Sequence, residues 1–333
     1  MVLDNGVLIT LIVQPHLSLL DISPAPPASF IIKMTFPHIL RLILAGILSL
    51  PALVLLACVA PLIALLSIPS LAIITRRKHR FFPCLNGGSR DAPHPLLQHA
   101  IITGGSSGIG LSVAIELAKR ECLHITLIAR REDQLKDAQR LVQQAAGSNS
   151  KTKVHLVSVD VTDFETLQKK AAQLCDTTKL TACDKRPPGP PTILFNCAGY
   201  SIPLSFTDLS HTDFAALMNV NYLGSVHVVK AFLPYMLRNK QNSNIGGNII
   251  LTSSMSGQVG SYGYSAYSPT KFALRGFAES LTMELDAANE NQVNISLCYP
   301  PDTDTPGYEV ENKKKPEACR LISESGGIWD PQV

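Results

Sequence analysis

A tyrosine and a lysine stand four residues apart in the segment SAYSPTKFALRG, residues 265 to 276, where the chain is expected to enter a helix. Residues with this spacing share one face of a helix, so Tyr267 and Lys271 can point toward a common spot. A free phenol holds its proton up to a pKa of about 10, and a nearby cation favours the phenolate and shifts that value toward neutrality. The pair therefore predicts a tyrosine that exchanges a proton with a substrate. Because the same spacing is common on protein surfaces, its surroundings decide the interpretation.

A glycine-rich turn, TGGSSGIG at residues 103 to 110, follows an expected strand and precedes an expected helix. Glycines let a diphosphate approach free backbone N–H groups at the positive end of the helix. A tight turn without a ligand is the alternative, but the context of strand, turn and helix favours a nucleotide site. The residues expected to bind the nucleotide here are Gly104, Ser106, Ser107, Gly108 and Gly110.

The same turn also fits a second pattern, G-x-S-x-G at residues 104 to 108, which is the form of a serine-hydrolase nucleophile elbow. A hydrolase needs an acid and then a histidine later in the chain. His155, His211 and His227 follow, but none lies in a recognisable late loop. The turn also belongs to the first strand of the series, so hydrolysis is the weaker interpretation.

The end of the second expected strand, LIARRED at residues 127 to 133, carries Arg130 where a site for NAD would have an acid to hold the ribose hydroxyls. An arginine instead suits a 2′-phosphate. We therefore expect NADPH as the cofactor, with Arg130 as its clamp and Arg131 assisting. The alternative is two solvated arginines at the start of a helix.

Alternating strands and helices are expected to position these residues. The pattern predicts an α/β fold with a doubly wound parallel sheet, the Rossmann arrangement, in one domain over residues 96 to 310. The expected strands are 100–105, 123–129, 153–160, 192–197, 247–253 and 293–299, and the expected helices are 109–120, 131–146, 163–176, 212–239 and one that follows residue 267.

The first 80 residues have a different character. Residues 42 to 75 form a run of 34 positions without Asp, Glu, Lys, Arg or His, and a basic cluster, RRKHR, follows at 76–80. About 20 apolar residues span a bilayer, and basic flanks favour the cytosolic side. We expect residues 34–80 to be a membrane anchor, with the rest of the chain in the cytosol, and assign no role to the extension 1–33. The number of crossings stays open, and the small net charge of +3 suggests no nucleic-acid partner.

Several motifs in a fixed order resemble the short-chain dehydrogenase/reductase family, over about residues 98 to 310. The resemblance rests on T-G-x-x-x-G-x-G at 103–110, Asn196-Cys197-Ala198-Gly199, Asn221 in NVNYLGS, Ser253-Ser254, and Tyr267 with Lys271.

The resemblance implies catalytic roles for four residues. Tyr267 is expected to be the general acid that protonates a carbonyl oxygen, and Lys271 to lower its pKa and bind the nicotinamide ribose. Ser254 is expected to hydrogen-bond the same oxygen, and Asn221 to hold a water in a proton relay. Seen alone, Ser254 could instead be a serine that bonds the backbone at a strand end, and Asn221 a polar residue inside a helix.

Further cofactor contacts also follow from the resemblance. Asp160, at the end of the third strand, is expected to meet the adenine, and Asn196 to open the turn that lines the cofactor. Cys197 stands where the family often has a second asparagine, a change that we do not expect to abolish binding.

A narrower likeness concerns residues 299–324, NYLGSV at 221–226 and the expected anchor. These features are similar to a subgroup of the family that reduces a long-chain sphingoid base with NADPH at the endoplasmic reticulum membrane. The likeness implies a bilayer as partner, a catalytic domain that faces the cytosol and, from the wider family, a possible homodimer. A membrane-anchored retinoid or steroid dehydrogenase, or an inactive form that only binds, are the alternatives.

The end of the chain departs from the family. Relatives continue with a further helix and a seventh strand, whereas residues 311–333 are expected to be a truncated substrate loop. We therefore expect an unpaired sheet edge, and whether the chain is active stays open.

Overall fold

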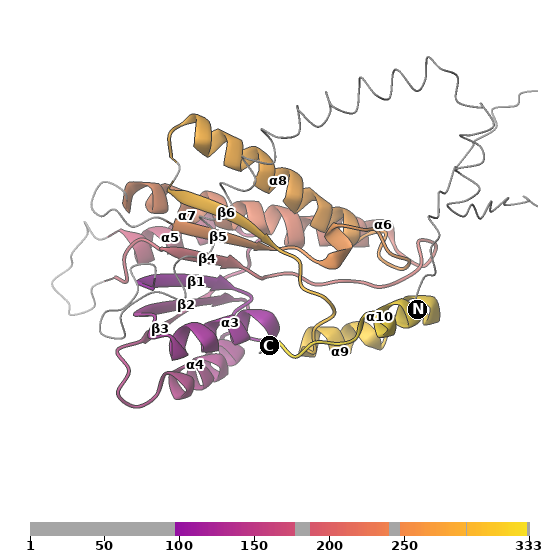
Figure 1. The fold of residues 1–333 in the computed structure, drawn as a ribbon, viewed down its shortest axis with the longest axis horizontal. Coiled ribbons are helices and arrows are strands. Elements are labelled where there is room, and N and C mark those ends of the chain that lie inside the picture. Colours follow the sequence, from indigo (N-terminus) through magenta and orange to yellow (C-terminus); the bar gives the residue numbers. More distant parts are fainter. Residues whose placement is uncertain (1–96, 177–186, 240–246, 291, 332–333) are drawn as a thin grey trace, which may run out of the picture. The chain divides into compact units, whose positions relative to one another are not determined.

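In the part of the chain that the structure describes, six parallel strands form one sheet, in the order β3-β2-β1-β4-β5-β6 (Figure 1). The computed structural model describes residues 97–176, 187–239, 247–290 and 292–331. The doubly wound α/β fold predicted from the sequence is confirmed. The strands are β1 (His99–Thr103), β2 (His124–Ala129), β3 (Lys153–Ser158), β4 (Ile193–Asn196), β5 (Gly247–Thr252) and β6 (Val293–Cys298).

Helices connect the strands and cover both faces of the sheet, with α3 and α4 on one side and α5, α7 and α8 on the other (Figure 1). This arrangement is expected when parallel strands are joined by crossovers. The helices of the described residues are α3 (Gly108–Lys119), α4 (Glu132–Ala146), α5 (Phe164–Cys175), α6 (His211–Leu217), α7 (Gly224–Asn239), α8 (Ser268–Ala287), α9 (Pro306–Asn312) and α10 (Glu317–Gly326).

Strand β1 shows why the sheet is buried on both faces. Successive side chains of a strand point to opposite faces. Ala100 and Ile102 pack into the core that contains Leu135 of α4, whereas Ile101 packs into the core that contains Phe232 of α7. All of these side chains are buried, and their apolar character therefore stabilises both layers.

The crevice for a ligand follows from the strand order. The chain winds outward from β1 through β2 to β3, and then returns to the other side of β1 with β4. Ile102 of β1 accordingly pairs with Leu127 of β2 on one side and Phe195 of β4 on the other. In open α/β sheets a ligand binds at the carboxyl ends of the strands where the order reverses in this way.

The helix predicted across 212–239 is present, but one of its turns is irregular. A π-helical turn, Met218–Leu223, separates α6 from α7. Turns of this kind are frequent at functional sites, and this one holds the fully buried Asn221. Gly224 follows directly, and a Cβ atom there would lie 2.7 Å from Val161 Cγ2. The close approach requires glycine at the point where the regular helix resumes.

The segment after β6 is more ordered than the expected substrate loop. Helix α9 begins with Pro306, and the Thr305 hydroxyl accepts a hydrogen bond from the Tyr308 backbone N–H at 3.1 Å. Both features are typical of a helix start. The segment 311–333 thus contains the end of α9 and all of α10, and its role as a substrate loop stays a prediction.

In the described part of the chain, no helix is long and apolar enough to cross a membrane. The expected anchor, residues 34–80, and the extension 1–33 lie outside the described residues.

Candidate active site

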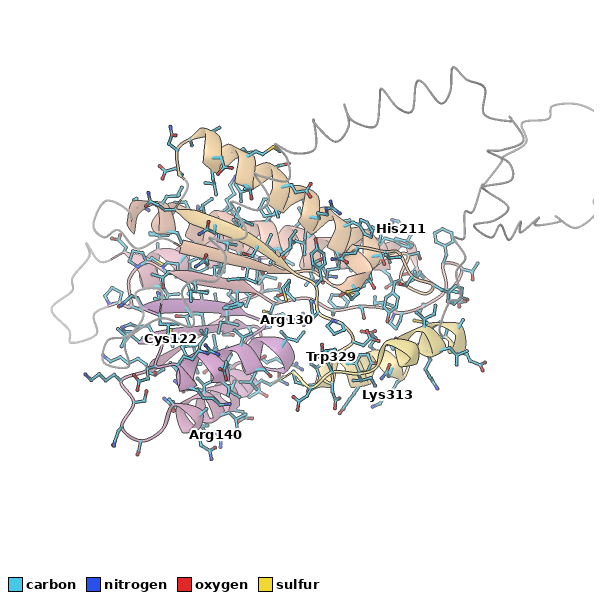
Figure 2. The ribbon with its side chains drawn as sticks, in the orientation of Figure 1. Cys122, Arg130, Arg140, His211, Lys313 and Trp329 are labelled. Carbon is cyan, nitrogen blue, oxygen red and sulfur yellow. The ribbon has the colours of Figure 1, made fainter. Side chains whose placement is uncertain are left out.

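A pocket of about 300 Å³ lies at the carboxyl ends of the strands, between the glycine turn, the ends of β2 and β3, the loop after β4 and the start of α9. Figure 2 shows Arg130 at this end of the sheet and Cys122 at the opposite end. No histidine of the described residues lines the pocket, so Ser106 has no base there for the hydrolase alternative. Among the residues predicted to bind a cofactor, the pocket is lined by Gly104, Ser106, Ser107, Gly108, Gly110, Arg130 and Asp160.

The glycine turn has the geometry of an anion site. Gly104 has a φ of 65°, in the left-handed region that favours glycine. Gly110, in the first turn of α3, lies so close to Gly104 that a Cβ atom would be 2.5 Å from the Gly104 carbonyl oxygen. Ser107 occupies the N-cap position, and its side chain makes no capping hydrogen bond. The first N–H groups of α3 are therefore not engaged by the cap and are available to a phosphate.

Replacing Gly110 by alanine is expected to weaken dinucleotide binding at least about tenfold and to lower the free energy of unfolding by about 1 to 3 kcal/mol, because the added methyl group must push α3 away from the turn. Fluorescence titration with the dinucleotide and denaturant unfolding measure the two effects. Gly276→Ala is the matched control, since a Cβ atom there meets nothing within 4 Å. Equal behaviour of the two variants would contradict the assigned role of the turn.

Asn196 does not line the pocket, contrary to its expected place among the cofactor-binding residues. Its side chain is buried, with Oδ1 accepting from the Thr103 hydroxyl at 3.0 Å and Nδ2 donating to the Ser225 carbonyl oxygen at 3.0 Å. The Thr103 oxygen in turn accepts from the backbone N–H groups of Cys197 and Ala198, each at 3.1 Å. Asn196 therefore positions the loop that lines the pocket, and the loop itself faces the ligand.

Arg130 and Asp160 face one another across the pocket. The Arg130 Nη1 atom lies 3.8 Å from Asp160 Oδ2, and the two side chains are 72% and 37% exposed. An exposed pair of this kind contributes little to stability, so the guanidinium can turn toward a ligand at small cost. Asp160 Oδ1 is held by the backbone N–H and hydroxyl of Thr162, at 2.9 and 2.8 Å.

Tyr267, Lys271 and Ser254 come together where β5 ends and α8 begins. Tyr267 is the residue before α8, and the Lys271 ammonium lies 5.6 Å from the centre of its ring. Ser254 begins a short 3-10 turn after β5 and lies close enough to Tyr267 to act on the pKa of its phenol. Lys271 is buried and donates to the Thr252 carbonyl oxygen at 2.9 Å. One phenol, one hydroxyl and one ammonium thus meet at a single site.

The electrostatics of this site differ from the sequence-based expectation. Burial raises the pKa of Tyr267, although the Ser254 hydrogen bond acts to lower it. The carboxylates of Glu311 and Asp302 raise it further. The expected lowering by Lys271 was therefore wrong for the chain without cofactor, because desolvation of the phenolate dominates. Burial lowers the pKa of Lys271 itself to about 8.

Gly199 connects the nucleotide pocket with the catalytic residues. It lines the pocket, and a Cβ atom at this position would lie 2.9 Å from Asn221 Oδ1 and 3.6 Å from Lys271 Nζ. Asn221 binds both backbone groups of the next residue, accepting from the Tyr200 N–H at 3.0 Å and donating to the Tyr200 carbonyl oxygen at 2.9 Å. It also donates to the Thr270 hydroxyl at 3.2 Å. The Asn221 side chain therefore holds the pocket wall against α8.

Cys197 lies in the pocket wall, where its Sγ atom accepts a hydrogen bond from the Thr252 hydroxyl at 3.3 Å. Burial raises the pKa of this thiol to about 11. The thiol stays protonated at neutral pH and adds no charge beside the Lys271 ammonium.

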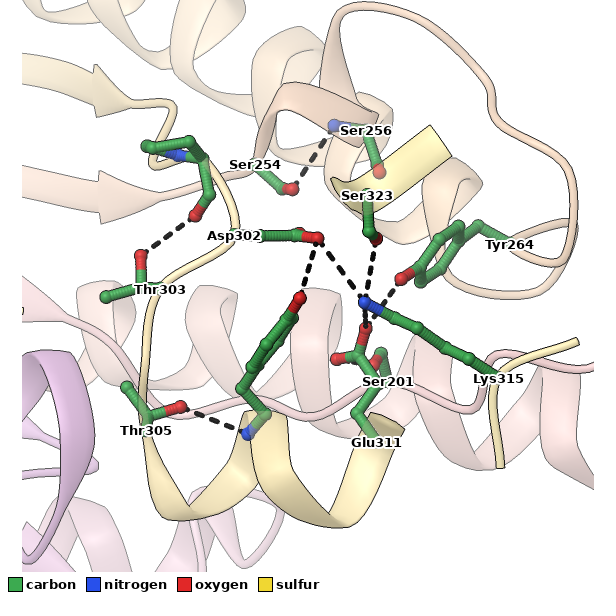
Figure 3. A network of polar contacts seen from close by, with 12 residues as sticks. Ser201, Ser254, Ser256, Tyr264, Asp302, Thr303, Thr305, Glu311, Lys315 and Ser323 are labelled. Atoms are coloured by element: carbon green, nitrogen blue, oxygen red, sulfur yellow. Dashed lines mark hydrogen bonds and ion pairs between the residues drawn. The ribbon is translucent and has the colours of Figure 1, made fainter. Parts of the chain in front are cut away.

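A group of polar residues near the site connects α9 to the segments around it (Figure 3). The sequence-based predictions did not include these residues. Glu311 of α9 accepts hydrogen bonds from the hydroxyls of Ser201 and Tyr264. Lys315 forms ion pairs with Glu311 and Asp302. These five residues, called here the α9 network, come from three distant parts of the chain, so no local motif marks them. The only local signal is the helix start at Thr305 and Pro306.

The fold and the site together define an oxidoreductase that uses a nicotinamide dinucleotide: a glycine turn for the diphosphate lies beside a hydroxyl, a phenol and an ammonium that can act on a carbonyl. The family model described as short chain dehydrogenase matches residues 98–316. The chain belongs to the short-chain dehydrogenase family.

Curated relatives are similar over most of the domain. The chain is 41% identical over 245 residues to 3-ketodihydrosphingosine reductase of Bos taurus, which covers 72% of this chain and 68% of the relative. The same identity and coverage relate it to 3-dehydrosphinganine reductase of Danio rerio. A 3-ketodihydrosphingosine reductase of Dictyostelium discoideum is 36% identical over 242 residues, 70% of this chain and 68% of the relative.

A solved structure shows the same fold. An alcohol dehydrogenase of Thermococcus sibiricus, complexed with 5-hydroxy-NADP, superimposes with a TM-score of 0.55 at 23% identity. The match covers 70% of this chain and 85% of that chain.

Proposed function

We propose that the chain reduces 3-ketosphinganine to sphinganine with NADPH, a step of sphingolipid biosynthesis. The observation that carries the proposal is the meeting of Ser254, Tyr267 and the buried Lys271 beside the wall of the nucleotide pocket. The printed names of the relatives from cattle, zebrafish and Dictyostelium support the choice of ketone.

Each residue of the site has a separate role in the reduction. The hydroxyls of Ser254 and Tyr267 bind the ketone oxygen, and the bound cofactor supplies the hydride. Tyr267 then donates its phenolic proton to that oxygen. With its raised pKa, Tyr267 holds its proton at neutral pH, so the proton is present when the ketone binds, and a nearby positive charge is needed to favour its release.

Lys271 supports this transfer as a positive charge. A pKa of about 8 keeps its amine mainly protonated at pH 7. The ammonium stabilises the phenolate that remains after Tyr267 has given up its proton, and it is placed close enough to the Gly199 wall to bind the ribose of the nicotinamide. Thr252 fixes its direction through the 2.9 Å hydrogen bond.

Arg130 favours NADPH over NADH in this proposal. The pocket offers its guanidinium, with Arg131 beside it, at the end of β2, where a 2′-phosphate on the adenosine ribose would be neutralised. Asp160 closes the same part of the pocket and suits the adenine. The glycine turn receives the diphosphate through backbone N–H groups. The residues present thus fit a dinucleotide that carries a third phosphate.

Arg130→Met is expected to raise the KM for NADPH about 10- to 100-fold and to change the KM for NADH less than about twofold, because only NADPH loses a charged partner. Steady-state kinetics with both cofactors measure the difference. Arg140→Met, an exposed site on α4, is the control for loss of one positive charge. An equal rise for both cofactors would show that Arg130 does not recognise the extra phosphate.

The long alkyl tail of the proposed substrate supports a location of the protein at a membrane. Each buried CH₂ group contributes about 0.8 kcal/mol, so a long alkyl tail keeps the ketone in a membrane. Residues 34–80 would anchor the chain in the endoplasmic reticulum membrane with the catalytic domain facing the cytosol, and the charge-free run at 42–75 supports this part of the proposal. We also propose a homodimer, on the ground of family membership alone.

The test is oxidation of NADPH by membranes that contain the full chain, with 3-ketosphinganine, retinal or a ketosteroid as the added substrate. Turnover is expected with 3-ketosphinganine, and it should be absent with NADPH alone. Turnover of only retinal or the ketosteroid would assign another substrate to the same site, and no turnover of any would reject the proposed activity.

A further inference from the structure

Glu311 lies between two walls of the proposed active site. Its Oε1 atom accepts from the Tyr264 hydroxyl at 2.6 Å, and its Oε2 atom accepts from the Ser201 hydroxyl. Ser201 follows the loop that lines the nucleotide pocket, whereas the Tyr264 ring lies 5.7 Å from the ring of Tyr267. The carboxylate is thus connected to both the cofactor wall and the catalytic phenol.

The ion pairs of the α9 network leave an excess of negative charge. Lys315 Nζ lies 3.3 Å from Glu311 Oε1 and 3.3 Å from Asp302 Oδ2, so one ammonium serves two carboxylates. Lys315 also donates to the Ser323 hydroxyl at 2.8 Å and lies 4.2 Å from the centre of the Tyr308 ring. Figure 3 shows the two carboxylates directed at this ammonium from opposite sides.

The charged side chains of the α9 network differ in how far they are exposed to solvent. The Lys315 side chain is 0% exposed, whereas those of Glu311 and Asp302 are 17% and 32% exposed. Of these three charged side chains, only the two that carry carboxylates are partly exposed, whereas the one that carries the ammonium is enclosed. Burial is the largest cause of the raised pKa of Tyr267, and the negative charges of Glu311 and Asp302 add to it.

We infer that Glu311 is a specificity-determining residue that binds an ammonium group on the carbon next to the ketone, and that it selects α-amino ketones over ketones without a charge. This inference rests on the proposed function. In 3-ketosphinganine the amino group is attached to the carbon beside the carbonyl carbon, and it is protonated at neutral pH. When Ser254 and Tyr267 hold the carbonyl oxygen, the ammonium on the next carbon lies close to it, and the inference places Glu311, which is joined to the neighbourhood of Tyr267 through Tyr264, beside that ammonium.

A purely structural role of Glu311 makes a different prediction. If Glu311 only fastened α9 through Ser201, Tyr264 and Lys315, its loss would affect every ketone alike. A carboxylate that binds the substrate ammonium affects only substrates that carry this group. The ratio of two substrates therefore separates the roles.

The experiment compares 3-ketosphinganine with an analogue of the same chain and the same terminal hydroxyl in which hydrogen replaces the amino group. Glu311→Gln keeps the size and an acceptor oxygen but removes the charge. The variant is expected to lower kcat/KM for 3-ketosphinganine about 10- to 100-fold and to leave that for the analogue within about twofold. Glu309→Gln, the same change at an exposed position of α9, should leave both values unchanged.

The outcomes distinguish the two proposals. Failure of the unsubstituted chain to reduce 3-ketosphinganine rejects the proposed function and the inference with it. If the unsubstituted chain reduces 3-ketosphinganine but Glu311→Gln does not change the ratio of kcat/KM for the two substrates, only the role of Glu311 is rejected. If thermal unfolding with NADPH shows that Glu311→Gln does not fold, Asp302→Asn carries the same test, with an expected fall in the ratio of about 3- to 10-fold. An unchanged ratio there overturns the inference.

Discussion

Replacing Tyr267 by phenylalanine is expected to slow the reduction of 3-ketosphinganine by about 10²- to 10⁴-fold, the contribution usual for a positioned general acid. The change removes one oxygen, and with it both the proton donor and the phenolic partner of the neighbouring Ser254 hydroxyl. The nucleotide pocket does not include the phenol, so affinity for NADPH should stay within about threefold. Single-turnover oxidation of NADPH and a separate titration of its binding measure the two quantities.

A surface tyrosine provides the control for this change. Tyr262 is 54% exposed, and Tyr262→Phe should keep full activity. If Tyr267→Phe reduces the ketone as fast as Tyr262→Phe does, the assignment of the acid is wrong. A loss of NADPH binding equal to the loss of rate would instead point to a structural role for Tyr267.

Replacing Lys271 by methionine is expected to abolish most activity, again by about 10²- to 10⁴-fold, and to stabilise the chain without cofactor. Burial lowers the pKa of Lys271 from 10.5 to about 8, which corresponds to roughly 3 kcal/mol of destabilisation at neutral pH. Removal of the amine leaves the Thr252 carbonyl oxygen without this partner, at a cost of about 1 to 3 kcal/mol. A net gain of about 0 to 2 kcal/mol in the free energy of unfolding is therefore expected at pH 7.

The pH dependence of stability gives this prediction a second test. Between pH 8 and 10.5 the unfolded chain holds a proton on residue 271 that the folded chain has released. Stability should therefore rise with pH across this window, relative to the variant, and the advantage of Lys271→Met should shrink. Denaturant unfolding at pH 7 and near pH 10 measures it, with Lys119→Met, at an exposed position of α3, as the control. A variant that is less stable at pH 7 would show that the buried amine does not destabilise the fold.

Much of the fold follows from local sequence patterns. The apolar run Ala100–Ile102 and the glycines after it predict a buried strand and a tight turn, and the structure has both. The spacing of Tyr267 and Lys271 places both on α8 or at its start, as expected. These features depend on neighbours in the sequence, so a pattern suffices to predict them.

Other features depend on contacts between distant residues. Asn196 belongs to a motif that suggests a ligand, yet its side chain is hydrogen-bonded to Thr103 and to the Ser225 backbone. The pKa of Tyr267 rises because packing removes water from the phenol, and no spacing along the chain reports burial. Glu311 lies 47 residues from Tyr264 in sequence, and only the folded chain brings them together.

The central claim is that Tyr267 protonates the oxygen of a ketone while the adjoining carbon receives hydride from a nicotinamide cofactor. The most direct measurement supplies the full chain with 3-ketosphinganine and NADPH that carries deuterium at the transferable position, and locates the label in the product by mass spectrometry. We predict sphinganine with one deuterium at carbon 3, formed rapidly by the unsubstituted chain and very slowly by Tyr267→Phe. Product without label at that carbon, or the same rate from both proteins, would contradict the account.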